Sequence, residues 1–217
     1  MRKVVSILVL IMLIWSLSAV SASIAKQYKW EAMGRTWTLT QAYAFEAYQH
    51  YRTLPRVSNY TAYADYIREP SDDEALDGLV AELKALADEA SFDSWDRLNL
   101  VVSFIQSLRY APEEGEYPRY PLETLVEGCG DCEDMAILAA AIFQQMGYDV
   151  VLLAYMEEAH MAVGVRVTPP DPSGFHAYEW NGGTYYYVEP TGTGWAIGRI
   201  PPTYTSMPDI IAVTSAS

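Results

Sequence analysis

Cys129 and Cys132 are the residues of this 217-residue chain best suited to covalent chemistry. Cys132 stands in the run Gly-Asp-Cys-Glu-Asp, where a glycine-containing turn meets the predicted start of a helix. A helix N-terminus lowers a thiol pKa and offers free N–H groups to an oxyanion, which favours a nucleophile at this position. The adjacent acids Asp131, Glu133 and Asp134 oppose this effect, so a cationic partner is required. Lone cysteines are more often structural and buried, but this polar setting is not typical of burial.

Three histidines are candidates for that partner. His160 opens a predicted strand directly after a polar turn, which puts it at the end of a sheet. His176 lies in a Pro- and Gly-containing loop and His50 in an aromatic segment, and both are interpreted as surface histidines. A catalytic base also needs a third group to fix its tautomer. Glu189 ends a later predicted strand, and antiparallel pairing with the His160 strand would bring its carboxylate to the ring.

The elements that must position these residues follow from the spacing of apolar side chains. Helical spacing predicts helices over 72–90, 94–108 and 131–146, the last ended by Gly147. Alternating and continuous apolar runs then predict strands over 149–155 and 161–167 and a hairpin over 178–189. Helices followed by an antiparallel sheet predict an α+β fold. The aromatic-rich segment over 30–66 has mixed periodicity and receives no assignment.

The first residues differ in composition from the rest of the chain. Arg2 and Lys3 precede an apolar run over 4–20, and small residues follow it. This order is typical of a secretory signal, and an uncleaved membrane anchor is the competing interpretation. We therefore expect residues 1–25 to direct export, with the rest secreted or held at the outer face of the cell membrane. Contact with the membrane would run only through this segment. The formal charge of -14 argues against nucleic acid as a partner.

Four blocks, in chain order, resemble the transglutaminase-like superfamily, and most closely its microbial exported members, many of them archaeal. These blocks are Tyr120-Pro121-Leu122-Glu123-Thr124-Leu125, Gly130-Asp131-Cys132-Glu133-Asp134, His160-Met161-Ala162-Val163-Gly164-Val165 and Tyr186-Tyr187-Val188-Glu189-Pro190-Thr191. The resemblance covers about half of the chain. It implies a papain-like core with Cys132 as nucleophile, His160 as base and Glu189 as orienting acid. Aspartate is the commoner third member in the superfamily, so Glu189 departs from the pattern.

The resemblance also implies an activity and an organisation. The implied reaction is acyl transfer from a peptide or side-chain amide through a thioester, as in a cysteine protease or amidohydrolase acting on a protein or peptide. A crosslinking acyltransferase and a non-catalytic binding module are the alternatives. No cofactor is required, but Asp131 and Glu133 match acids that bind calcium in the bacterial periplasmic protease branch. The expected divisions are a leader over 1–25, an N-terminal segment over 26–90, the core over 91–205 and a tail over 206–217.

The spacing Cys129-x-x-Cys132 leaves two other interpretations. Two cysteines in an exported chain ordinarily form a disulfide, but a bridge this short closes almost no loop and stabilises little. A thioredoxin-like redox site would need the pair at a strand-to-helix turn of a βαβ unit, whereas a Pro-rich segment precedes it here. A zinc site would need about four ligands, which this chain supplies poorly.

Overall fold

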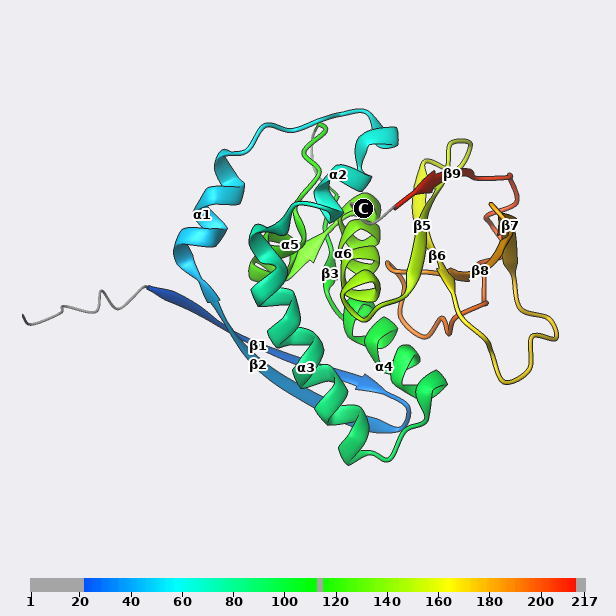
Figure 1. Cartoon of the computed structure of the whole chain (residues 1–217), viewed down its shortest axis with the longest axis horizontal. Coiled ribbons are helices and arrows are strands. Elements are labelled where there is room, and N and C mark those ends of the chain that lie inside the picture. The colour runs from blue at the N-terminus through cyan, green and yellow to red at the C-terminus, as the bar shows by residue number, and fades with distance from the viewer. Residues whose placement is uncertain (1–21, 113–114, 214–217) are drawn as a thin grey trace, which may run out of the picture.

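The computed structural model describes residues 22–112 and 115–213, whose path Figure 1 traces. The predicted leader therefore lies outside the described residues up to position 21. Its last residues, Ser23 to Ala25, belong instead to the first strand, because they pair with β2. Within the described ranges, no helix combines the length and apolarity that crossing a membrane requires.

The aromatic segment that the sequence left unassigned begins with a long antiparallel hairpin of β1 (Ser23–Ala32) and β2 (Arg35–Ala44). Its two-residue turn has positive φ at both Met33 and Gly34, as a hairpin with the right-handed strand twist requires. One face carries the buried side chains, and Trp30 stacks on its cross-strand partner Trp37 with ring centroids 6.3 Å apart. This face packs on the helices α3 (Asp73–Glu89) and α4 (Ser94–Gln106).

Short elements connect the hairpin to these helices and complete the helical half of the molecule. They are α1 (Phe45–Thr53), η1 (Tyr60–Ala62), α2 (Ala64–Ile67) and η2 (Pro70–Asp72). After α4 come β3 (Arg109–Tyr110), α5 (Pro121–Glu127) and β4 (Cys129–Gly130). Within β4, Cys129 pairs in parallel with Arg109 of β3.

Helix α6 (Cys132–Gln145) runs through the middle of the molecule, between the other helices and the sheet (Figure 1). Every residue from Asp134 to Phe143 is buried, so the helix is apolar on nearly all sides. A helix of this kind belongs in a core rather than on a surface. The core therefore surrounds α6 and fixes the position of its first residue, Cys132.

A five-stranded antiparallel sheet covers one side of α6, in the order β7-β8-β6-β5-β9. Its strands are β5 (Asp149–Tyr155), β6 (His160–Arg166), β7 (Ala177–Trp180), β8 (Gly183–Val188) and β9 (Asp209–Ala212). The predicted α+β class, with helices packed on an antiparallel sheet, is confirmed.

The C-terminal residues correct one expectation. Residues 206–217 were predicted to form a tail, but Asp209–Ala212 forms β9 and pairs antiparallel with β5. Four residues are too few to show an alternating pattern in the sequence. The strand exists because β5 offers a free edge to it, which is a property of the assembled sheet.

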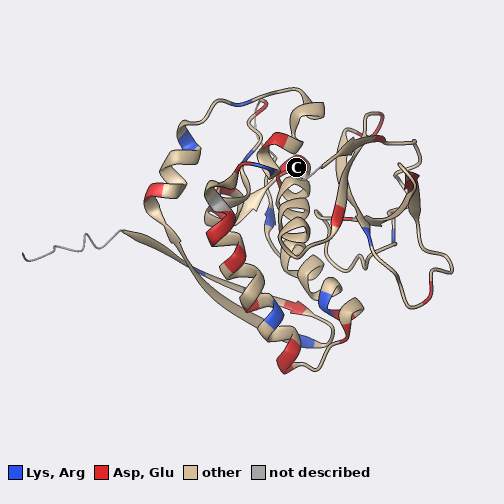
Figure 2. Cartoon of the chain, in the orientation of Figure 1, with Lys and Arg blue, Asp and Glu red and all other residues tan. Residues whose placement is uncertain are grey.

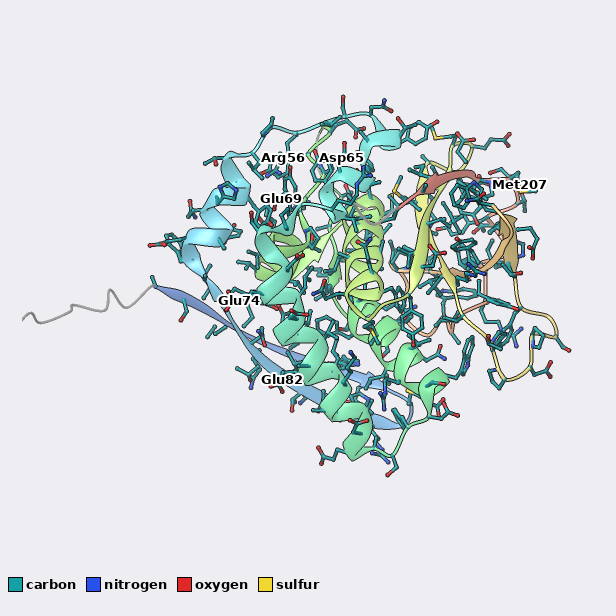
Figure 3. All side chains as sticks on the ribbon, viewed as in Figure 1. Arg56, Asp65, Glu69, Glu74, Glu82 and Met207 are labelled. Carbon is teal, nitrogen blue, oxygen red and sulfur yellow. The ribbon has the colours of Figure 1, made fainter. Side chains whose placement is uncertain are left out.

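Acidic side chains dominate the exposed face of α3, where Figure 2 shows a row of red residues. Glu74 and Glu82 project from this face into solvent (Figure 3). Such a surface keeps a protein soluble by self-repulsion and offers phosphate groups no binding charge.

Two glycine substitutions test the packing that holds β6 in place. A Cβ at Gly164 would lie 2.8 Å from Val151 Cγ2 and 3.0 Å from Tyr185 Cβ, both buried. Gly164→Ala should therefore lower the free energy of unfolding by about 1–3 kcal/mol. The contrasting variant is Gly78→Ala in α3, where a Cβ meets only the flexible end of Gln41. There the helix propensity of alanine should raise stability by up to about 1 kcal/mol. Urea unfolding of both variants measures the difference, and equal effects would contradict the proposed packing at Gly164.

Candidate active site

Cys132 is the first residue of α6, and Asp131 is its N-cap. Asp131 and Asp134 each accept, with the side-chain carboxylate, a hydrogen bond from the backbone of the other residue. The Asp134 N–H donates to Asp131 Oδ1 at 3.5 Å, and the Asp131 N–H donates to Asp134 Oδ2 at 3.3 Å. This capping box satisfies part of the unpaired first turn and fixes the direction from which the chain enters the helix. The predicted helix start at this position is confirmed.

Asp134 also anchors the segment before the helix, through a residue that sequence reasoning did not single out. The Arg119 N–H donates to Asp134 Oδ1 at 2.6 Å, and the Arg119 guanidinium pairs with Asp134 Oδ2. Burial raises the pKa of Asp134, while these contacts from Arg119 lower it. Gly130 packs so closely on Asp134 that an added Cβ would lie 2.5 Å from the Asp134 Cβ. The turn therefore requires glycine there.

The Cys132 sulfur lies against the backbone on both sides of His160. Its nearest carbonyl there is Ala159 O, at 4.0 Å, and the Met161 N–H hydrogen-bonds to the sulfur. On its other side the thiol donates to Glu133 Oε2 at 3.2 Å. No hydrogen bond joins the sulfur to the His160 ring within residues 22–112 and 115–213.

The thiol is neutral in this resting arrangement. Burial, followed by the charge of Glu133, raises the pKa of Cys132 to about 12, although the Met161 hydrogen bond lowers it. The opposition of the adjacent acids to the helix N-terminus, expected from the sequence, is found in this state. The loss of water and the charges of Glu133 and Asp131 outweigh the helix dipole.

His160 and Glu189 are brought together by the pairing of β6 with β8. His160 Nε2 lies 3.1 Å from Glu189 Oε2, and both side chains are buried. The Tyr204 ring stacks on the imidazole, with centroids 4.3 Å apart and planes 16° apart. The antiparallel arrangement predicted from the sequence is the one found, although Glu189 follows β8 rather than ending it.

Glu189 is held as a carboxylate by several donors. The Tyr187 hydroxyl donates to Oε2 at 2.5 Å, and the Thr191 N–H and hydroxyl donate to Oε1 at 2.9 and 2.6 Å. Burial raises the pKa of Glu189, but the bonds from His160, Thr191 and Tyr187 outweigh it and hold the pKa below its usual value. A charged acceptor at Nε2 assigns the proton to that nitrogen. Nδ1 of His160 is then the atom with a free lone pair.

Sequence reasoning also missed Gln106 and Tyr110. Buried Gln106 donates from Nε2 to the carbonyls of Glu189 and Trp195, both at 2.8 Å, and accepts from the Gly194 N–H at 3.1 Å. Tyr110 pairs with Gly130 across β3 and β4. Partial burial raises the pKa of Tyr110, and a negative charge on Cys132 would raise it further. In the sequence, Gln106 could have been identified as a polar residue on the apolar face of a predicted helix.

The other histidines stay apart from this group. His50 is exposed on α1. His176 is half-buried and bonds through Nε2 to the Tyr178 hydroxyl at 2.8 Å, so its hydrogen-bonding capacity is satisfied there. Burial lowers the pKa of His176. Among the described residues, neither ring contacts Cys132 or Glu189, and both agree with the sequence interpretation as satisfied or surface histidines.

Neither a disulfide nor a metal cluster is formed by the described residues. Cys129 is buried in β4 and Cys132 is partly buried, and both are free thiols, so the Cys129–Cys132 bridge is absent here. No three His, Cys, Asp or Glu side chains in the described ranges are grouped to hold a metal ion. Calcium takes six to eight oxygen ligands, and Asp131 and Glu133 supply too few by themselves. Calcium binding by Asp131 and Glu133 stays a prediction, and no step below depends on it.

Comparison with known proteins gives little beyond this geometry. No family model and no curated protein matches the chain. One similar solved structure is described as "a Putative Cysteine Protease from Cytophaga hutchinsonii". It shares 12% sequence identity with a TM-score of 0.40, over 88% of this chain and 74% of that one. A likeness at this level carries no argument about function, and the site has to be interpreted from its own contacts.

The contact between Cys132 and Glu133 predicts a specific change in thiol reactivity. Glu133→Gln removes the negative charge beside the sulfur, so the thiol pKa should fall and the thiolate fraction at neutral pH should rise. Alkylation of Cys132 by iodoacetamide at pH 7.5 should then be faster by roughly threefold to tenfold.

The matched control is Glu157→Gln, which removes the same charge from an exposed position in the turn before His160. It should leave the alkylation rate within a factor of about two, as for most surface charges screened by salt. Rates that respond equally to both substitutions would show a general effect of net charge rather than the Glu133 contact.

Proposed function

We propose that this protein is an exported, transglutaminase-like thiol enzyme that hydrolyses peptide or side-chain amides through a Cys132 thioester. The observation that carries the proposal is the position of the Cys132 sulfur. It lies between the backbones of Ala159 and Met161, the two neighbours of a histidine whose ring is already bonded to a buried carboxylate. Export rests on the leader pattern of the first residues.

Attack begins from the neutral thiol. As the sulfur forms its bond to the amide carbonyl carbon, the thiol proton passes to His160 Nδ1 and the carbonyl electron pair moves to oxygen. Because the thiol pKa is raised to about 12, proton transfer accompanies attack instead of preceding it. The thiol must also give up its hydrogen bond to Glu133. The oxyanion is stabilised by free N–H groups at the start of α6.

Breakdown of the intermediate uses the same proton. His160 Nδ1 gives it to the amide nitrogen, the C–N bond breaks, the amine leaves and a thioester remains. Water then attacks the thioester carbon while His160 takes one of its protons. The C–S bond breaks, and the proton returns to the sulfur. Glu189 stays ionised throughout and stabilises the imidazolium that forms twice in each cycle.

The two cysteines provide the first test. Cys132→Ala should abolish turnover, a loss on the order of 10⁴–10⁶, because it removes the nucleophile. Cys129→Ser should keep most of the activity, since Cys129 is buried in β4, and some loss of stability is expected from its polar hydroxyl. Release of peptides from unfolded β-casein, with and without a primary amine, measures the activity. Melting temperatures identify variants that fail to fold.

A folded, inactive Cys129→Ser with an active Cys132→Ala would overturn the assignment of the nucleophile. Loss of activity in both folded variants would instead support the redox pair. Incorporation of the added amine in place of hydrolysis would identify the crosslinking alternative.

The Glu189 carboxylate provides the second test. Glu189→Gln should lower kcat by up to about 10⁴-fold, because a neutral amide no longer stabilises the imidazolium. Tyr187→Phe is the matched control, as it deletes one donor to the same oxygen but leaves the charge in place. It should cost far less, about tenfold or below. Steady-state hydrolysis rates of both variants are compared at pH 7, and wild-type kcat in Glu189→Gln would assign the orienting role to another residue.

A further inference from the structure

A cavity lies beside the tip of the β1–β2 hairpin, and Cys132 is not part of its lining. Its volume is about 730 Å³, and it is bounded by the end of β1, by α4 and by the loop over 193–196. Three tryptophans line it, namely Trp30, Trp95 and Trp195. Trp30 donates its indole N–H to Ser103, whereas those of Trp95 and Trp195 have no partner in the described residues. An aromatic wall with a few polar groups is typical of a binding site.

The hairpin contributes five consecutive residues to this wall, from Lys29 to Met33. Side chains of a strand alternate between its faces, and here Trp30 is buried while Lys29 and Glu31 are exposed. A cavity that touches residues of both faces must lie along the edge of the strand. No residue of β2 belongs to the described lining, so the edge in question is the outer edge of β1.

That edge carries unpaired backbone groups. The two-residue turn makes Ala32 and Arg35 a hydrogen-bonded pair. From this pair onward, non-hydrogen-bonded and hydrogen-bonded pairs alternate along the hairpin. Trp30 therefore bonds inward to Trp37, while the N–H and C=O groups of Lys29 and Glu31 point outward. In the described part of the chain, no residue outside the hairpin hydrogen-bonds to the backbone of Lys29 or Glu31. The cavity thus presents donors and acceptors in the spacing of a strand.

We propose that this cavity binds an extended polypeptide segment as a third strand on the outer edge of β1. Strand addition to a free edge takes its affinity from backbone hydrogen bonds and its selectivity from pockets for alternate side chains. In this cavity Trp95 and Trp195 form the pocket for a side chain of the added strand. Their rings suit an apolar or aromatic side chain that has a polar neighbour in the bound polypeptide. The occupant is a polypeptide without proline at the paired positions.

The cavity shares a loop with the candidate active site. Glu189 opens the loop that follows β8, and Gly194 and Trp195 of the same loop form part of the cavity wall. Gln106 joins the two, because its side chain bonds to the Glu189 carbonyl, the Gly194 N–H and the Trp195 carbonyl, and itself lines the cavity. We therefore assign the bound strand to the protein substrate. Within the substrate chain, this segment is separated from the amide that reacts. This assignment rests on the proposed function.

Two proline substitutions on one cross-strand pair test the proposal. Lys29 pairs with Thr38, and both have outward-facing N–H groups, but on opposite edges of the hairpin. Proline removes such a donor without breaking the β1–β2 ladder. The full chain carrying Cys132→Ala is used, so that the bound polypeptide is not consumed. Binding of fluorescein-labelled β-casein, an unfolded polypeptide, is measured by anisotropy in Lys29→Pro and Thr38→Pro, with melting temperatures alongside.

Lys29→Pro should weaken binding about tenfold, through one lost hydrogen bond and a blocked edge, and Thr38→Pro should bind as the parent does. In the parent chain, saturating β-casein should slow amide exchange at Lys29 and Glu31 and leave Thr36 and Thr38 unchanged. Equal affinities of the two proline variants, or exchange protection that spares Lys29 and Glu31, would overturn the proposal. Since no turnover is needed, a chain that binds in this way but hydrolyses nothing would overturn only the proposed function.

Discussion

The carboxylate of Glu189 is buried and charged, and this constraint organises much of the surrounding structure. A buried charge is costly unless donors surround it, so each of its oxygens needs partners. His160 and Tyr187 supply them on one oxygen and Thr191 on the other. These donors come from β6, β8 and the loop that follows β8. The requirement of one charge thus ties the histidine, the central strands and the loop into a single arrangement.

The opposite constraint applies at Cys132, where the surroundings oppose a charge. The sulfur shares its end of α6 with Asp131, Glu133 and Asp134, and it donates to the nearest of them. The acids serve the fold, because two of them form the capping box that starts the helix. Their presence beside the sulfur also helps to raise the pKa of the Cys132 thiol, which is therefore neutral. Such a site depends on a base that removes the proton during attack, which is why the fixed tautomer of His160 matters.

Besides the apolar core around α6, polar contacts join the two halves of the molecule. Gln106, from the helical half, bonds to the loop that leaves the sheet after Glu189. The same loop forms one wall of the tryptophan-lined cavity, and the free edge of β1 forms another. A polypeptide bound along β1 would therefore contact the loop that carries the orienting acid. Substrate binding and the geometry of the acid share one structural element.

The sequence by itself determined the features that depend on neighbouring residues. Apolar spacing predicted the three main helices and strands β5 and β6, and the acids after Gly130 predicted a helix beginning at Cys132. The sequence also indicated that Glu189 would lie beside His160 if their strands paired antiparallel, as β6 and β8 do. These are short-range patterns, and the side chains that encode them lie within a few residues of one another.

Only the tertiary structure decided the features that depend on contacts between distant segments. Arg119 reaches Asp134, Tyr204 covers His160, Gln106 holds the loop after Glu189, and Asp209–Ala212 becomes a strand beside β5. The pKa of Cys132 belongs to the same group, because burial and the direction of the Glu133 side chain set it. Burial and partner geometry are properties of the packed chain, and residue order in one sequence does not encode them in a readable pattern.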